Sequence, residues 1–160
     1  MAESVSLRAK VLTVSDGVVA GTRDDASGQA LVEQLTAAEF DVVEHDVTVD
    51  GADEVATALA RMSDGFAGLI VTTGGTGFAP RDQTPEGTRR VIDREAPGLA
   101  EAMRLVSPHG RLSRGVAGVR GTAIICNTPG SPKGCVEQLG AILDVMPHAL
   151  RLLQGSPTEH

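Results

Sequence analysis

The sequence predicts an α/β protein, a three-layer α/β/α sandwich around a mostly parallel sheet. Apolar runs of strand length alternate along the chain with segments of helical periodicity, and strands separated by helices have to pair in parallel through right-handed crossovers. A chain of 160 residues, 41% of them hydrophobic, is long enough to close one substantial core. No repeat or linker divides it, so we expect one domain over residues 1–160, with an ordered core from about 5 to 154.

The first half of the chain carries three predicted strands, at residues 7–14, 41–49 and 68–73. A polar, glycine-containing loop follows the first strand, and Ser27 is placed to cap the helix that comes next. A second helix is predicted over residues 52–62, where apolar residues recur at helical spacing. Two strand–helix units therefore precede the third strand.

A strong helix start follows the third strand. Thr84 is the expected cap, Pro85 occupies the first helical position and Glu86 places an acid in the first turn. We expect Pro97 and Gly98 to interrupt this helix.

The last third of the chain begins with a flexible stretch at residues 107–118 and a buried strand at 122–127. Ser131 and Pro132 then repeat the cap-and-proline start and open the final helix. Pro147 is expected to kink or break that helix, leaving a short helical end. The tail at 155–160 is expected to fray.

Composition excludes two classes of partner. A formal charge of −7 gives no general attraction to nucleic-acid phosphates or to anionic lipid, and three Phe with no Trp or Tyr leave little to stack on bases. We therefore expect neither nucleic-acid nor membrane binding. Cys126 and Cys135 do not form a disulfide pattern, and residues 1–6 lack the basic and apolar parts of a signal peptide, which favours the cytoplasm.

Two glycine-containing loops follow predicted buried strands, at the sheet edge where parallel strands bind ligands. Residues 72–77 read Thr-Thr-Gly-Gly-Thr-Gly, which lets backbone N–H groups close around a phosphate. Residues 127–132 read Asn-Thr-Pro-Gly-Ser-Pro and point a helix N-terminus at the same crevice. Each loop alone has the simpler interpretation of a tight turn, whereas the pair favours a nucleotide site.

Two aspartates are placed to face this crevice. Asp50 ends a predicted strand, and Asp82 lies shortly after the first glycine loop. Paired carboxylates in a phosphate-binding cleft favour Mg²⁺, although aspartates at such positions commonly cap turns or helices instead. Arg81, Arg114 and Lys133 are either available cations or solvated surface charges.

Six short motifs stand in a fixed order along most of the chain. They are Val14-Ser15-Asp16, Asp25-Ala26-Ser27-Gly28, Thr73-Gly74-Gly75-Thr76-Gly77, Asp82-Gln83-Thr84-Pro85-Glu86, Leu112-Ser113-Arg114-Gly115-Val116-Ala117-Gly118 and Pro129-Gly130-Ser131-Pro132. This ordered set resembles the MoaB/Mog family of molybdenum cofactor biosynthesis. The resemblance implies a molybdopterin-binding fold that usually forms trimers. Gly17, where many members carry arginine, and Thr128, where an aliphatic residue is common, depart from the family pattern.

The resemblance also implies an activity. Catalytic members of the family are molybdopterin adenylyltransferases, which join the nucleotide of Mg-ATP to the phosphate of molybdopterin and release pyrophosphate. When the functional residues of the family are transferred to this sequence, Asp50 and Asp82 match the two catalytic acids and would hold Mg²⁺. The nucleotide phosphates would lie among Gly74, Gly75, Thr76, Gly77, Pro129, Gly130 and Ser131. Molybdopterin would contact Asp25, Ser27, Gly28, Ser113 and Arg114.

The expected partners are small molecules, ATP and molybdopterin, together with Mg²⁺. The resemblance adds a homotrimer and the hand-over of product to the molybdenum-inserting enzyme of the pathway. A phosphate monoester nucleophile is already anionic at neutral pH, so the transfer needs alignment and charge neutralisation more than a strong general base. The alternative is a non-catalytic molybdopterin-binding carrier of the same pathway; the presence of both acids favours the enzyme.

Overall fold

The structure, a computed structural model, describes residues 7–155. Six strands form one sheet in the order β2-β1-β3-β6-β5-β4. The strands are β1 Arg8–Val14, β2 Asp41–Thr48, β3 Gly68–Thr73, β4 Arg94–Glu95, β5 Ala117–Arg120 and β6 Ala123–Thr128. The pairs β1-β2, β1-β3 and β3-β6 are parallel, whereas β5 pairs antiparallel with both β6 and β4. The sheet is therefore mixed, and its four longer strands are parallel.

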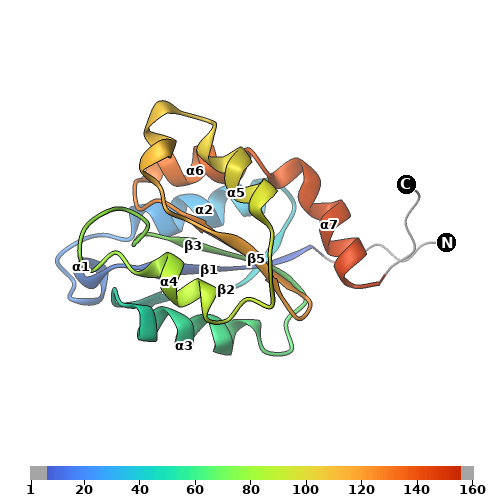
Figure 1. Ribbon diagram of the computed structural model, residues 1–160, viewed down its shortest axis with the longest axis horizontal. Helices are drawn as coiled ribbons and strands as arrows, with labels where there is room; N and C mark the ends of the chain where they lie inside the picture. Colours follow the sequence, from blue (N-terminus) through green and yellow to red (C-terminus); the bar gives the residue numbers. More distant parts are fainter. Residues whose placement is uncertain (1–6, 156–160) are drawn as a thin grey trace.

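Helices cover both faces of this sheet (Figure 1). One face carries α2 (Ala26–Ala37), α5 (Pro97–Arg104), α6 (Pro132–Gly140) and α7 (Met146–Leu153), and the other carries α3 (Ala52–Ser63) and α4 (Thr84–Arg89). The short α1 (Asp16–Val19) lies at one end of the sheet. Each face has its own apolar core, one built around residues such as Leu31 and Met146 and the other around Val55 and Leu59. The predicted three-layer α/β/α arrangement is confirmed.

The predictions for the two central strands, β3 and β6, were correct because both strands are buried on both faces of the sheet. Every residue of β3 and β6 is buried, and a strand covered on both faces takes a nearly continuous run of apolar residues. The edge strand β2 alternates in exposure along its first half. The strands β4 and β5 were not predicted. They have two and four residues, which are too few to show the alternation of apolar and polar residues that marks a strand.

The predicted helix caps had mixed outcomes. Ser131 caps α6, accepting a hydrogen bond from Gly134 N at 3.0 Å, as predicted. The prediction for Ser27 was wrong, because Asp25 caps α2 and accepts from Gly28 N. The prediction for Thr84 was also wrong. Gln83 is the N-cap residue of α4, and the Thr84 hydroxyl donates to Gly74 O at 2.9 Å, since that buried carbonyl needs a donor.

Two helices end or begin at prolines in ways that differ from the prediction. The helix α4 ends at Arg89, and Pro97, expected to interrupt it, begins α5 instead. The prediction for Pro147 was also wrong: α6 ends at Gly140, a 3₁₀ turn spans Leu143–Val145, and Pro147 lies in the first turn of α7, where a proline fits the helix. The stretch 107–118, expected only to be flexible, contains a 3₁₀ helix at Pro108–Leu112 and the start of β5.

Both cysteines are free and buried. Burial raises the pKa of the Cys126 thiol to about 12 and that of Cys135 to about 11, so neither is a reactive thiolate near neutral pH. Within residues 7–155, no helix combines the length and apolar character needed to cross a membrane. The expectations for residues 1–6 and for the tail beyond Gly155 lie outside the described residues.

Candidate active site

A crevice of about 720 Å³ opens at the carboxyl ends of β1, β3 and β6, where open parallel sheets bind their ligands. Most residues predicted to form a site line it: Ser27, Asp50, Gly74, Gly75, Thr76, Gly77, Asp82, Ser113, Pro129, Gly130 and Ser131. Asp25, Gly28 and Arg114 do not line it. The structure therefore brings together segments that are up to about a hundred residues apart in sequence.

The first glycine loop approaches neighbouring backbone too closely for other residues. Gly74 and Gly75 have φ of 98° and 71°, and a Cβ on Gly74 would lie 2.2 Å from Val14 O. Thr84 fixes the loop, because its N–H donates to Gly75 O at 3.1 Å. Among the described residues, no acceptor bonds the backbone N–H groups of Gly75, Thr76 and Gly77. These groups are available to an anion in the crevice.

The second loop lies directly against the first. Thr73 Oγ1 donates to Pro129 O at 2.8 Å, and Gly74 N donates to Thr128 O at 3.1 Å. A Cβ on Gly130 would lie 3.4 Å from Gly74 Cα, so the two loops share one wall of the crevice. The N–H groups of Gly130 and Ser131 also find no acceptor within residues 7–155, and they precede the first turn of α6.

Asp50 is held at the mouth of the crevice by Asp16. Asp16 N donates to Asp50 Oδ2 at 2.9 Å, and Asp50 N donates to Asp16 Oδ1 at 3.1 Å. Burial raises the pKa of Asp50, and the charges of Asp16 and Asp82 add to this effect. By contrast, the hydrogen bonds from Arg81 lower the pKa of Asp16.

Asp82 is fixed by its own loop. Its Oδ2 accepts a hydrogen bond from Ala79 N at 3.0 Å, and its backbone N–H donates to Ala79 O at 2.9 Å. Oδ1 of Asp82 and Oδ1 of Asp50 have no hydrogen-bond donor among residues 7–155. Two carboxylate oxygens without donors, on aspartates that both line the crevice, are hard ligands of the kind that Mg²⁺ takes.

These carboxylates fit a substrate-bound cation better than a permanent metal. Within residues 7–155, no group of three or more His, Cys, Asp or Glu side chains is placed to hold a metal ion. Mg²⁺ binds through one or two carboxylates together with substrate phosphates and water. Asp50 and Asp82 are therefore suited to Mg²⁺ that arrives with a polyphosphate.

The three cations proposed from the sequence have other partners. Arg81 forms an ion pair with Asp16 at 2.6 Å, Arg114 pairs with Glu86 at 2.9 Å, and Lys133 lies 3.9 Å from Glu137 with its side chain 88% exposed. None of the three lines the crevice.

Arg23 is the cation that the sequence analysis missed. Among the described residues it is the Arg or Lys that lines the crevice, and it forms no ion pair there. Arg23 packs close to Gly17, where a Cβ would lie 3.3 Å from Arg23 Cβ. His109, on the 3₁₀ helix, also lines the crevice. Neither residue carries a local sequence signal, because Arg23 lies in a loop and His109 in a short 3₁₀ helix, and tertiary packing decides which way each segment faces.

Asp25 and Gly28 lie behind the wall of the crevice. Asp25 accepts hydrogen bonds from Gly28 N and Thr13 Oγ1 and lies 2.8 Å from His45 Nε2. A Cβ on Gly28 would lie 2.4 Å from Thr13 Oγ1. These residues position the start of α2, whose buried Ser27 lines the crevice.

The fold and the site define a class: an α/β protein with a crevice lined by two glycine-containing loops and two aspartates at the carboxyl ends of parallel strands. Comparison with known families identifies which one. The family model described as a probable molybdopterin binding domain matches residues 10–148. The chain belongs to this molybdopterin-binding family, so the resemblance stated from its motifs is confirmed.

Relatives with assigned functions are similar over nearly their full length. The molybdopterin adenylyltransferase of Helicobacter pylori strain J99 is 38% identical, over 91% of this chain and 87% of that protein. The molybdopterin adenylyltransferase of Escherichia coli K12 is 34% identical, over 96% and 89%. Among solved structures, the molybdopterin biosynthesis enzyme MoaB from Thermus thermophilus is 48% identical with a TM-score of 0.87, covering 96% of this chain and 99% of that one.

Proposed function

We propose that this protein is a molybdopterin adenylyltransferase of molybdenum cofactor biosynthesis, which transfers the adenylyl group of Mg-ATP to the phosphate of molybdopterin and releases pyrophosphate. The observation that carries this proposal is a single crevice that combines unbonded backbone N–H groups from two loops with two carboxylates. The names of the relatives, enzymes of this activity at 34–38% identity, support the same assignment.

The backbone amides would perform most of the positioning. The N–H groups of Gly75, Thr76 and Gly77 on one loop, and of Gly130 and Ser131 on the other, would donate to the nucleotide phosphates. Because these groups are fixed before the substrate binds, they stabilise charge on the transferring phosphoryl oxygens without reorganising. The two loops would therefore align the α-phosphate for attack.

Asp50 and Asp82 would hold Mg²⁺ against the triphosphate. The ion, when bound, supplies neutralisation of the charge that develops on the phosphates. Asp50 suits this role because its ionised form is disfavoured by burial and by neighbouring carboxylates, and a cation relieves both. The proposed reaction uses no side-chain base, since the molybdopterin phosphate is itself an anionic nucleophile.

Molybdopterin would lie in the part of the crevice lined by Ser27 and Ser113. Arg23 and His109 line the same crevice, and Arg23 would bind one of the anionic groups of the substrates. This assignment replaces Arg114, which the resemblance had placed against the pterin and which does not line the crevice.

The proposed assembly is a homotrimer in the cytoplasm that hands its product to the molybdenum-inserting enzyme. Large apolar side chains at the surface of the single chain, including Phe78 at 70% and Leu105 at 84% exposure, support burial in a closed assembly. Light scattering at micromolar concentration should report three times the 16.5 kDa chain mass. A species of 16.5 kDa alone would contradict the trimer.

The activity is tested by pyrophosphate release. Purified protein with molybdopterin and Mg-ATP should release pyrophosphate in proportion to the molybdopterin supplied. Release that is independent of molybdopterin, or none at all, would reject the proposed transfer.

A further inference from the structure

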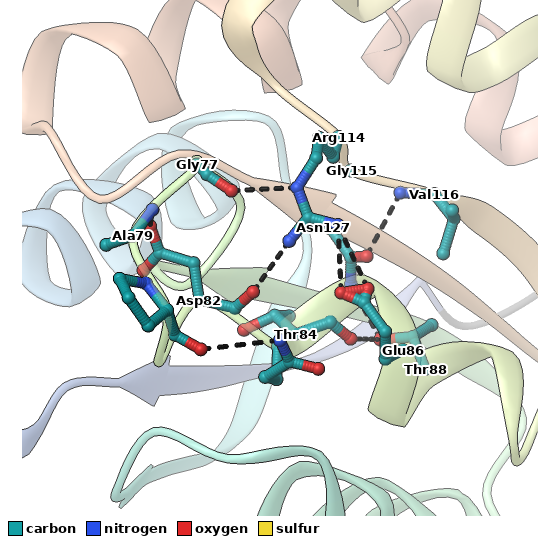
Figure 2. Close-up of polar contacts among 12 residues, drawn as sticks. Gly77, Ala79, Asp82, Thr84, Glu86, Thr88, Arg114, Gly115, Val116 and Asn127 are labelled. Carbon is teal, nitrogen blue, oxygen red and sulfur yellow. Dashed lines mark hydrogen bonds and ion pairs between the residues drawn. The ribbon is translucent and has the colours of Figure 1, made fainter.

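The guanidinium group of Arg114 connects both ends of the loop that carries Asp82. Its Nε donates to Gly77 O at 2.8 Å, and its Nη2 donates to Asp82 O at 2.6 Å. Its Nη1 lies 2.9 and 3.0 Å from the two carboxylate oxygens of Glu86, and its backbone N–H donates to Thr76 O at 2.8 Å. Figure 2 shows these side-chain contacts converging on one residue.

The loop between Gly77 and Asp82 is closed internally and is tied to the rest of the fold through Arg81 as well as through Arg114. The Arg81 guanidinium donates to both carboxylate oxygens of Asp16, at 2.6 and 3.0 Å, and to Asp50 O at 3.0 Å. Ala79 and Asp82 bond each other in both directions, which fixes the Asp82 carboxylate relative to its own loop. Phe78, Ala79 and Pro80 are exposed in the single chain. Contacts from outside the loop therefore decide where the carboxylate stands relative to the glycine loop.

Arg114 is itself firmly placed. Two residues further on, Val116 N donates to Asn127 Oδ1 at 3.0 Å, and Asn127 Nδ2 donates to Thr72 Oγ1 and Thr88 Oγ1 at 3.0 Å each. Asn127 is fully buried in β6. The Arg114 segment is thus tied to the centre of the sheet, as the Asn127 contacts in Figure 2 show.

The guanidinium contacts the backbone carbonyl of Asp82 and not its carboxylate. The guanidinium therefore leaves the carboxylate oxygens open to a cation. Glu86 balances the charge of Arg114, and both residues line a hollow beside α4 and α5 instead of the crevice.

We propose that Arg114, paired with Glu86, is a positioning residue that sets the Asp82 carboxylate for the cation of the substrate. This inference rests on the proposed function for its catalytic consequence and on the contacts above for its geometry. A lysine cannot replace it, because one ammonium group does not reach three acceptors in different directions as a planar guanidinium does.

The test compares Arg114→Lys with Arg104→Lys. Arg104 is the matched control, because its Nη1 donates to Gly115 O at 2.7 Å and so supports the same segment without touching the Asp82 loop. Arg114→Lys should lower kcat by about 10- to 100-fold and weaken Mn²⁺ binding in the presence of ATP by a similar factor. The KM for molybdopterin should stay within about twofold, and Glu86→Gln should give a smaller change in the same direction.

Amide hydrogen exchange supplies a readout that does not depend on turnover. Exchange at residues 77–82 should accelerate in Arg114→Lys and stay unchanged in Arg104→Lys. Weaker molybdopterin binding with unchanged exchange would overturn the inference, because Arg114 would then be a ligand of the pterin. Equal losses in the two lysine variants would also overturn it. Accelerated exchange and weaker Mn²⁺ binding in a protein whose wild type lacks adenylylation would support the positioning role and reject the proposed function.

Discussion

Asp50 and Asp82 face one crevice as two like charges, and the charge of Asp82 adds to the burial that raises the pKa of Asp50. The Asp16 carboxylate acts in the same direction, whereas the charge of Arg81 opposes it. A bound cation would counteract the burial and the like charges that raise the pKa of Asp50.

The raised pKa of Asp50 predicts the acid side of the pH profile. An aspartate binds Mg²⁺ only when it is ionised, so kcat/KM should fall with decreasing pH at a higher pH than an ordinary aspartate would give. Arg81→Gln removes a charge that lowers the pKa of Asp50, so the acid limb should move to higher pH. Arg90→Gln, which removes a surface pair with Asp53, is the control. An acid limb that does not move in Arg81→Gln would contradict this account.

Asp82→Asn should abolish most turnover without unfolding the protein. The amide oxygen can still accept from Ala79 N, and only the charge that the cation requires is lost. We expect the adenylylation rate to fall at least about 100-fold, with Tm within about 2 °C of wild type. A variant that keeps the full rate, or one that loses rate only because its Tm collapses, would reject the catalytic role of Asp82.

Gly130→Val should obstruct the nucleotide site from the second loop. A Cβ at position 130 would lie at ordinary contact distance from Gly74, so the variant should fold. The branched valine side chain would keep a phosphate from approaching the backbone N–H groups of the loop. The Kd for Mg-ATP should rise by about tenfold or more, and far-UV circular dichroism should not change. Gly98→Val is the control, because a Cβ there meets open space outside the crevice. Unaltered ATP affinity would show that the loop is only a turn.

Arg23→Gln tests the cation that the structure added to the site. A charge-assisted hydrogen bond to a substrate anion predicts that KM for one of the two substrates rises by about five- to tenfold. Because Arg23 is exposed, the difference from wild type should shrink at high ionic strength. Lys133→Gln, which alters a charge outside the crevice, should leave both KM values unchanged. Equal effects of the two substitutions would assign Arg23 to general surface charge.

The sequence predicted those features that depend on local patterns. The strands β3 and β6 each begin with a run of apolar residues, and they were placed to within one residue. The cap at Ser131 follows from a hydroxyl and a proline at adjacent positions. The meeting of the two glycine loops follows from topology, since parallel strands end at the same edge of a sheet.

The remaining features depend on contacts between distant residues. Thr84 is a residue type that commonly caps helices. Its hydroxyl instead donates a hydrogen bond to the carbonyl of Gly74, ten residues earlier. Arg114 matches a family motif that implies contact with the pterin. Its guanidinium instead donates hydrogen bonds to Glu86 and to two backbone carbonyls. Arg23 lines the crevice and packs close to Gly17, where a Cβ would lie 3.3 Å from Arg23 Cβ. None of these partners could be assigned from residue type and spacing alone.

Direct detection of the product tests the central claim. Wild-type protein and Asp82→Asn are incubated side by side with molybdopterin and Mg-ATP, and the reaction mixture is analysed by mass spectrometry for adenylyl-molybdopterin. The account predicts accumulation of this species with the wild type and at least about 100-fold less with the variant. Wild-type protein that binds both molybdopterin and ATP yet forms no adenylylated product would contradict the account and identify a carrier.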